Sequence, residues 1–277
     1  MKHAPSVARR LFDLTEPVCL VNFFSDEPNE AMAELGFDNY WDGYFAGRAA
    51  PLGRVPAEVV DAAFYNFAEG EVARHIPRVW DRTSPEAAYA ARQRGCVAAL
   101  RRILGDLVEA PELERAAALL AEASVSAPTQ GRVMYAGLRS LPMPEDPLTR
   151  LWHAANMLRE HRGDGHVVAL VSERISGTEA HVLSALDMGV YPAESFGRIH
   201  HLPKARLAAV MDGLRGRGLL DASGRMTPAG CETKARIEAL TDALAEAPYE
   251  GLEASVLEEL ISLLEPISAR LRETGSQ

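Results

Sequence analysis

The sequence predicts an all-α protein with small β-wings, arranged as a tandem duplication of one helical unit. Three observations predict this class. Long amphipathic segments begin at helix-capping residues, segments that favour strands are few and short, and the two halves repeat the same order of proline-capped segments. The chain of 277 residues is 47% hydrophobic and 25% charged, a composition typical of a globular protein with a substantial core.

Composition also excludes several classes of protein. No apolar stretch reaches the ~18–20 residues that a membrane helix needs, and the N-terminal residues lack the apolar region of a signal peptide. The cysteines Cys19, Cys96 and Cys231 are odd in number and far apart, which predicts neither a disulfide framework nor a metal site. We therefore expect a cytoplasmic protein without a membrane partner. The net charge of -10 is unlike that of a dedicated nucleic-acid binder, so any basic surface is local.

The first half opens with an ambiguous segment and continues with clear helices. Residues 17–24, PVCLVNFF, fit a helix or a strand. Ser84 and Pro85 form an N-cap and a first helical position, and the long amphipathic segment after them predicts a helix. Residues 112–123 predict another. Residues 138–150 contain three prolines and are the expected linker.

The second half also contains several segments that predict helices. Residues 152–166, WHAANMLREHRGDGH, predict a helix that two glycines break, and residues 166–172, HVVALVS, favour a further helix. Thr227 and Pro228 open a long amphipathic segment, and residues 252–272 carry leucines at helical spacing.

The two halves are the expected copies of one unit. Residues 1–137 would form the first copy, 138–150 the linker and 151–277 the second copy, so that residues 30–137 and 165–272 superpose. The anchors are Pro56/Pro203, Pro85/Pro228 and Pro111/Pro248, at offsets of about 147, 143 and 137 residues. The alternative is that the two halves are unrelated and look alike only because both are helical and rich in Ala and Pro.

The second copy carries a series of predicted elements that is similar to one in a known protein family. Residues 203–217, PKARLAAVMDGLRGR, predict a helix that Gly218 ends; residues 219–227 predict a strand, a turn and a returning strand. This series resembles the recognition helix, wing and following helix of MarR-type winged-helix regulators, over about a quarter of the chain. The resemblance implies a wing-bearing helical domain and does not by itself imply DNA binding. The whole chain also resembles an actinobacterial family of tandem helix-turn-helix proteins, which implies a fold but no activity.

DNA binding is expected to be weak and confined to the second copy. The candidate contacts there are Lys204, Arg206, Arg215 and Arg217, although a solvated helix face would give much the same pattern. The corresponding residues 56–71 of the first copy contain no Lys or Arg. They carry four acids, Glu58, Asp61, Glu69 and Glu71. Acidic side chains repel the phosphate backbone, so a pair of half-site readers is not expected.

Residues 40–67 concentrate aromatic side chains, seven in all. Aromatic rings with polar tips suit a ligand pocket, whereas aromatic residues at helical spacing are also typical of a core. We expect a pocket because polar groups lie among the rings. The candidate ligand-binding residues here are Tyr44, Arg48, Phe64, Tyr65 and Asn66.

The segment HRGDGH is the second candidate site. His161 and His166, with Asp164 or Glu160, could form a polar ligand site or an acid–base pair, in which the two histidines are the catalytic candidates. Arg162 is a further candidate ligand contact. Alternatively the segment is a helix end and turn, in which Asp164 caps a helix that starts near Gly165. Metal binding is not expected, because H-x4-H is no established ligand spacing and no cysteine is near. The pair His200-His201 is expected to be a cap or a surface pair.

These observations favour a small-molecule-binding protein on a MarR-like tandem winged-helix scaffold, with possible weak regulatory binding of duplex DNA. The ligand would lie between the copies, with Tyr65 and His161 lining one cavity. The alternative is an enzyme of secondary metabolism, with His161 or His166 as general base and Arg48 or Arg162 holding an anionic group. A second alternative is a transcriptional regulator. No nucleotide-binding or nucleophile-elbow motif is present, and the sequence specifies no cofactor, ligand identity or oligomeric state.

Overall fold

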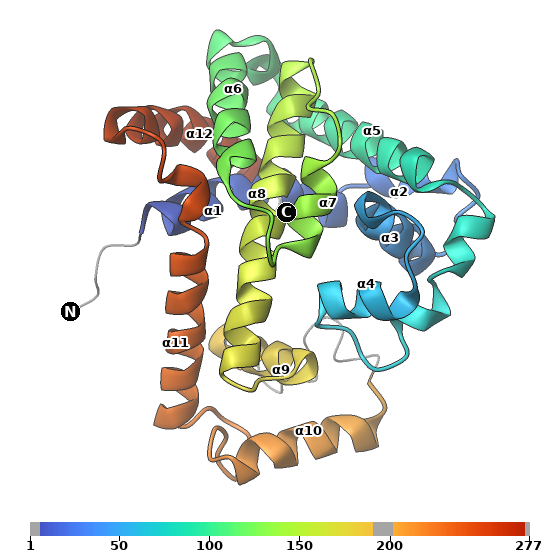
Figure 1. The fold of residues 1–277 in the computed structure, drawn as a ribbon, viewed down its shortest axis with the longest axis vertical. Helices are drawn as coiled ribbons and strands as arrows, with labels where there is room; N and C mark the ends of the chain where they lie inside the picture. The colour runs from blue at the N-terminus through green and yellow to red at the C-terminus, as the bar shows by residue number, and fades with distance from the viewer. Residues whose placement is uncertain (1–5, 191–201, 275–277) are drawn as a thin grey trace.

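The computed structural model describes residues 6–190 and 202–274, and the fold is predominantly helical, as the sequence predicts (Figure 1). The α-helices of the first half are α1 (Val7–Phe24), α2 (Glu27–Ala33), α3 (Tyr40–Ala49), α4 (Ala57–Phe64), α5 (Pro85–Leu104), α6 (Pro111–Ser126) and α7 (Val133–Arg139). Those of the second half are α8 (Pro147–Ser172), α9 (Gly177–Asp187), α10 (Lys204–Gly216), α11 (Pro228–Leu244) and α12 (Ala254–Thr274). Short 3-10 helices are η1 (Ala50–Leu52), η2 (Val72–Arg74), η3 (Arg78–Asp81), η4 (Gly105–Glu109) and η7 (Ala247–Tyr249).

Helix α8 runs through the centre of the molecule (Figure 1). Asp146 caps its first turn by accepting the Thr149 N–H at 2.9 Å, and Pro147 occupies a position that needs no N–H. The helix packs against α1, α5, α6, α7 and α11. Apolar side chains all round it are therefore buried, which is the pattern of a central rather than a surface helix.

Four core clusters hold the described helices together, and the smallest of them lies around Tyr135 of α7. The largest combines residues from both halves, such as Leu11 of α1, Leu120 of α6, Trp152 of α8 and Leu264 of α12. The second is aromatic and lies around α3, α4 and α5. The third joins the end of α8 to α9, α10 and α11. In Figure 1, α9 and α10 lie together at one end of α8, and α11 returns along its side.

The predicted helix break at HRGDGH is wrong, because α8 runs through both glycines. At Gly165 a Cβ atom would stand 2.4 Å from Nη1 of Arg132, so a larger residue would displace this arginine from the His161 and Leu244 carbonyls that it bonds. A glycine costs a helix only about 1 kcal/mol, and burial of α8 on several sides outweighs this cost. Of the expected linker, residues 138–139 end α7 and residues 147–150 begin α8.

The ambiguous residues 17–24 belong to α1, and HVVALVS belongs to α8. The expected wing of the second half is reduced to one antiparallel bridge between Leu220 and Met226. In the first half, residues 65–84 form turns and the helices η2 and η3, without a bridge. Across residues 6–190 and 202–274, no helix combines the length and the apolar character needed to cross a bilayer.

Candidate functional site

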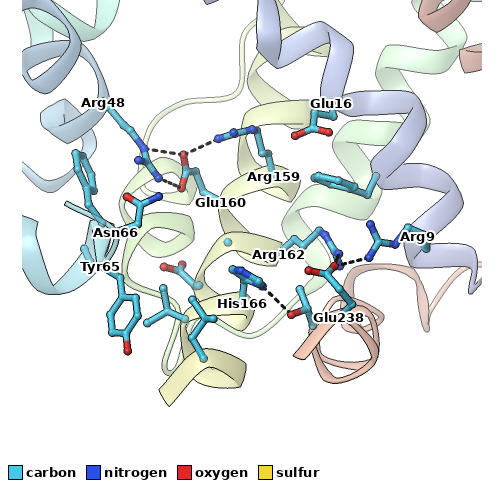
Figure 2. Close-up of a pocket in the computed structure, with 18 residues that line it drawn as sticks. Arg9, Glu16, Arg48, Tyr65, Asn66, Arg159, Glu160, Arg162, His166 and Glu238 are labelled. Carbon is cyan, nitrogen blue, oxygen red and sulfur yellow. Dashed lines mark hydrogen bonds and ion pairs between the residues drawn. The ribbon is translucent and has the colours of Figure 1, made fainter. Parts of the chain in front are cut away.

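A cavity of about 340 Å³ opens between α1, the end of α4, α8 and α11 (Figure 2). Its lining combines charged side chains with an apolar surface of similar extent, and its volume is at the low end of the usual range for ligand sites. The lining residues are Arg9, Phe12, Glu16, Arg48, Ala63, Phe64, Tyr65, Asn66, Arg159, Glu160, Arg162, Gly163, Asp164, His166, Val167, Leu170, Glu238 and Thr241.

The pocket brings together most of the residues that the sequence singled out, from segments about 100 positions apart. Those that line it are Arg48, Phe64, Tyr65, Asn66, Arg162, Asp164 and His166. Tyr44 does not line the cavity, but it supports a residue that does, because its hydroxyl accepts an N–H of Arg48 at 3.0 Å. His161 is the candidate that the pocket leaves out.

One end of the pocket is built around Glu160. Arg48 donates from Nε and Nη2 to the two oxygens of this carboxylate, at 3.3 and 3.2 Å. Arg159 approaches the same carboxylate at 3.6 Å. Burial opposes ionisation of Glu160, but the guanidinium groups of Arg48 and Arg159 hold its pKa below the ordinary value. The Arg48 guanidinium also lies 4.2 Å from the ring centre of Phe64, which fixes its plane.

The other end is built around two acids of α11, Glu238 and Asp242. Arg9 of α1 contacts them at 2.7 and 3.1 Å, and Arg162 of α8 contacts them at 3.4 and 2.7 Å. Lys234 also pairs with Glu238. Burial would raise the pKa of Glu238, yet Lys234 and Arg9 lower it to about 2, so this carboxylate is ionised throughout the physiological range.

His166 lies between these two ends (Figure 2). Its Nδ1 is 2.9 Å from the hydroxyl of Thr241, and that hydroxyl donates its proton to the Ile237 carbonyl at 2.7 Å. The network therefore assigns the proton of His166 to Nδ1 and leaves Nε2 as an acceptor. Burial lowers the pKa of His166, so the neutral ring is favoured at pH 7. A neutral imidazole with a free Nε2 can accept a hydrogen bond or a proton from a bound molecule.

Asp164 does cap a helix, but not the one expected. Its carboxylate accepts the backbone N–H groups of Met134 and Tyr135, at 3.3 and 3.0 Å, and so caps α7 from another part of the chain. Burial raises the pKa of Asp164 to about 6, against the effect of these N–H groups. Asp164 thus joins the pocket to the start of α7.

His161 lies outside the pocket. Its side chain is buried, and its ring packs edge-on against Tyr135 with 5.0 Å between the ring centres. Burial lowers the pKa of His161 to about 4. Tyr65 lines the cavity and His161 does not, which leaves His166 as the catalytic candidate within reach of a ligand.

The aromatic segment serves both of the roles that the sequence left open. Phe64 and Tyr65 line the pocket, whereas Phe45 and Phe67 pack against each other as tilted rings in the second core cluster. The difference follows from position, because α4 ends at Phe64 and the chain turns at Tyr65.

Sequence reasoning missed Arg9, Glu16, Arg159 and Glu238. One signal could have found Arg159. It is three and seven positions before Arg162 and His166, so the three project from one face of α8. Arg9, Glu16 and Glu238 carry no local signal, because only the packing of α1 and α11 against α8 brings them to the site.

The candidate DNA contacts gather on α10 and just after it. Lys204 is exposed in the first turn. The other three pair with acids: Arg206 with Glu69, Arg215 with Asp212 at 2.8 Å, and Arg217 with Glu179 at 3.1 Å. Residues 200 and 201, the expected cap or surface pair, lie outside the described residues.

Among the described residues, no group of three His, Cys, Asp or Glu is placed to hold a metal ion. Burial raises the thiol pKa of both Cys19 and Cys96 to about 12, so neither is a ready nucleophile.

Comparison with known proteins gives one result. A model of a helix-turn-helix family matches residues 8–277, nearly the whole chain. No curated protein and no solved structure matches.

Proposed function

Because the chain belongs to this helix-turn-helix family, we propose that it is a small-molecule-binding protein that holds its ligand in the pocket beside α8. One observation carries the proposal. Seven of the nine residues chosen from sequence as ligand contacts line a single cavity, although they come from both halves of the chain. Buried charged groups are costly, and their concentration around an open space is typical of a binding site.

Gly163 adds independent support. A Cβ atom at this position would meet only Glu160 Oε2, at 3.6 Å, so protein packing does not require the glycine. A glycine inside a helix costs about 0.5–1 kcal/mol relative to alanine. The space above Gly163 belongs to the pocket, and a ligand that approaches the helix there would explain why the position carries no side chain.

The scaffold is proposed to be a duplicated, MarR-like one. Helix α10, the Leu220–Met226 bridge and α11 support a wing-bearing unit in residues 151–277. Equivalent caps support the common origin of residues 1–137, since Ser84 caps α5 as Thr227 caps α11. Because the largest core cluster combines both halves, we expect neither copy to fold alone.

The experiment compares wild type with Gly163→Leu and Gly163→Ala in a thermal-shift screen of metabolites. A ligand at ~100 times its Kd adds about 2.7 kcal/mol to the stability of the protein that binds it. We expect hits that raise the Tm of the wild type by several degrees and leave that of Gly163→Leu unchanged, because the leucine fills the cavity. Gly163→Ala controls for the helix and should itself be slightly more stable than wild type. A screen in which no compound distinguishes wild type from Gly163→Leu would contradict the proposal.

Family membership favours a second function, weak binding of duplex DNA by α10. Lys204 and Arg206 lie in the first turn of this helix, where base-reading side chains stand in other helix-turn-helix proteins. Fluorescence anisotropy with a short labelled duplex tests it. Binding should weaken steeply with salt and should be lost in Lys204→Gln/Arg206→Gln. Nanomolar affinity for a palindromic operator at ~150 mM salt would instead indicate a dedicated regulator.

A further inference from the structure

The charges that line the pocket balance. Each of its arginines lies between 2.7 and 3.6 Å from a carboxylate oxygen. The arginines that line it are Arg9, Arg48, Arg159 and Arg162, and the acids are Glu16, Glu160, Asp164 and Glu238. A pocket whose charges already balance favours an uncharged ligand, because a net charge would leave water without gaining a counter-charge.

One face of α8 forms a wall of this pocket. Gly163, His166, Val167 and Leu170 follow the i, i+3, i+4, i+7 spacing that places side chains on one face of a helix, and all four line the cavity. Phe64, at the end of α4, lines it as well. The wall therefore offers apolar surface on both sides of an imidazole.

The imidazole of His166 has a free acceptor on this wall. Its Nδ1–H group bonds the Thr241 hydroxyl at 2.9 Å, and no group in the described part of the chain bonds its Nε2. The Nε2 atoms of His153 and His161 also lack partners, but those atoms are fully buried, whereas His166 lines the cavity (Figure 2). A ligand that covers Nε2 must supply a donor, because an acceptor removed from water without a partner is costly.

We propose that the ligand is an uncharged, largely apolar molecule with one N–H or O–H donor, which it directs at Nε2 of His166. This inference rests on the proposed function of the pocket. The apolar body of the ligand lies against Phe64, Val167 and Leu170, and the space over Gly163 admits it. An acidic or a basic ligand is disfavoured, since either would disturb the balance of charge around the cavity.

Five bicyclic probes test the ligand class. Indole donates through its N–H group, whereas benzofuran has nearly the same shape and an oxygen in place of that group. The uncharged 5-(hydroxymethyl)indole is the reference for indole-5-carboxylate and 5-(aminomethyl)indole, which carry opposite charges at pH 7. Isothermal titration calorimetry on the full chain should give an affinity about 10-fold higher for indole than for benzofuran. The reference should bind at least about 5-fold more tightly than either charged compound.

The accepting nitrogen can be observed directly by NMR of the ¹⁵N-labelled full chain. A neutral imidazole gives separate signals for its N–H nitrogen and its unprotonated nitrogen. Indole should move the signal of the unprotonated Nε2 of His166 toward the value of an N–H nitrogen, and benzofuran should move it less. The signals of His161, which lies outside the pocket, should stay in place.

Variants locate the preference. His166→Phe removes the acceptor, so indole and benzofuran should bind it with affinities within about 2-fold of each other. His161→Phe is the matched control, since it makes the same substitution on the same helix outside the pocket. It should keep the full preference for indole. If His166→Phe does not fold, the Nε2 signal of the wild type decides the question.

The outcomes separate the two proposals. If benzofuran binds as tightly as indole, or a charged compound as tightly as the reference, and Gly163→Leu abolishes that binding, the ligand class is wrong while the pocket function stands. If indole binds without moving the Nε2 signal of His166, the ligand class is also wrong.

If none of the five probes binds, the compounds that the thermal-shift screen identifies decide. Uncharged donors that move the Nε2 signal of His166 support the inference, and charged or donor-free compounds overturn it. If the screen yields no compound that Gly163→Leu excludes, the pocket function fails and the inference fails with it.

Discussion

The carbonyl oxygen of Tyr65 stands 2.0 Å from the point where Gly177 would carry a Cβ atom. Tyr65 also donates its hydroxyl proton to the Ile175 carbonyl at 2.7 Å, from a backbone with a φ of 60°. A residue that lines the pocket is therefore packed directly on the first turn of α9. Because α9 and α10 share the third core cluster, ligand contacts at Tyr65 lie next to the proposed DNA-binding helices.

This contact predicts that Gly177→Ala destabilises the protein. The new Cβ would meet backbone atoms of Tyr65 and Asn66, which cannot move without shifting the pocket wall. Overpacking of this kind costs about 1–3 kcal/mol in the free energy of unfolding, measured by urea denaturation.

The control is Gly213→Ala, in α10. Apart from its chain neighbours and the backbone of its own helix, no atom lies within 4 Å of its Cβ position, so the substitution should be neutral or stabilise α10 by up to about 1 kcal/mol. Equal effects of the two substitutions would show that the contact with Tyr65 does not constrain Gly177.

A second prediction concerns the pH dependence of stability through Asp164. Burial raises its pKa to about 6 in the folded protein, above the ordinary value of 3.8. The folded state therefore binds more protons than the unfolded state between about pH 4 and 6, and this group makes stability fall as pH rises through that range. In Asp164→Asn this contribution is absent. The free energy of unfolding of the wild type minus that of the variant should fall by about 2–3 kcal/mol between pH 4 and 7.

Comparison with the variant cancels the opposite contribution of the buried histidines, which both proteins share. A difference that stays constant with pH would mean that Asp164 titrates normally. The loss of one acceptor for the N–H groups of α7 should add a pH-independent cost of about 1 kcal/mol to the variant.

A third prediction separates the two histidines of α8 that were considered as catalytic candidates. Burial lowers the pKa of His161 to about 4, so the folded state keeps it neutral while the unfolded state takes up a proton below pH 6.5. Stability from this group is present above pH 6.5 and is lost as pH falls toward 4. His161→Phe should reduce that acid sensitivity by about 3 kcal/mol and should leave ligand binding unchanged.

The matched variant is His166→Phe, which removes the acceptor Nε2 from the pocket and should weaken binding of any ligand that the screen identifies. Reduced binding in His161→Phe together with normal binding in His166→Phe would reverse these assignments.

A fourth prediction concerns the ion pair between Glu69 and Arg206, which joins the acidic segment of the first half to α10. Exposed pairs contribute little to stability, so Glu69→Gln should change the free energy of unfolding by less than about 1 kcal/mol. It should raise affinity for duplex DNA several-fold at low salt, because it frees Arg206 and removes a negative charge from the approach of the phosphates. Fluorescence anisotropy measures this, and Glu86→Gln, at the start of α5, is the control. Unchanged affinity would show that Glu69 does not compete with DNA for Arg206.

The sequence predicted the fold class and several helix starts because those signals are local. Ser84 and Thr227 each cap a helix three residues ahead, and the interaction lies within one turn of the chain. The sequence misjudged HRGDGH for the same reason. Two glycines weaken a helix by local propensity, but contacts with α6, α7 and α11 keep α8 intact.

The candidate site shows where residue type alone is informative. Charged and aromatic groups at Arg48, Tyr65, Asp164 and His166 indicated a pocket, because such groups are costly to bury apart from one another. Residue type could not show that His161 faces Tyr135 while His166 faces the cavity. Five residues advance a helix by about 500°, so the two side chains project in different directions, and only the packing of α8 determines which one meets the ligand.

By itself the sequence determined the helical class, the caps and the chemical character of the site. The tertiary structure decided that α8 is continuous, that Asp164 caps α7, and that Arg9 and Glu238 complete the pocket. The physical reason is the range along the chain over which each kind of interaction acts. Capping and periodicity act within one or two turns of a helix, whereas a pocket is made by side chains that only the packing of distant helices brings within a few ångströms.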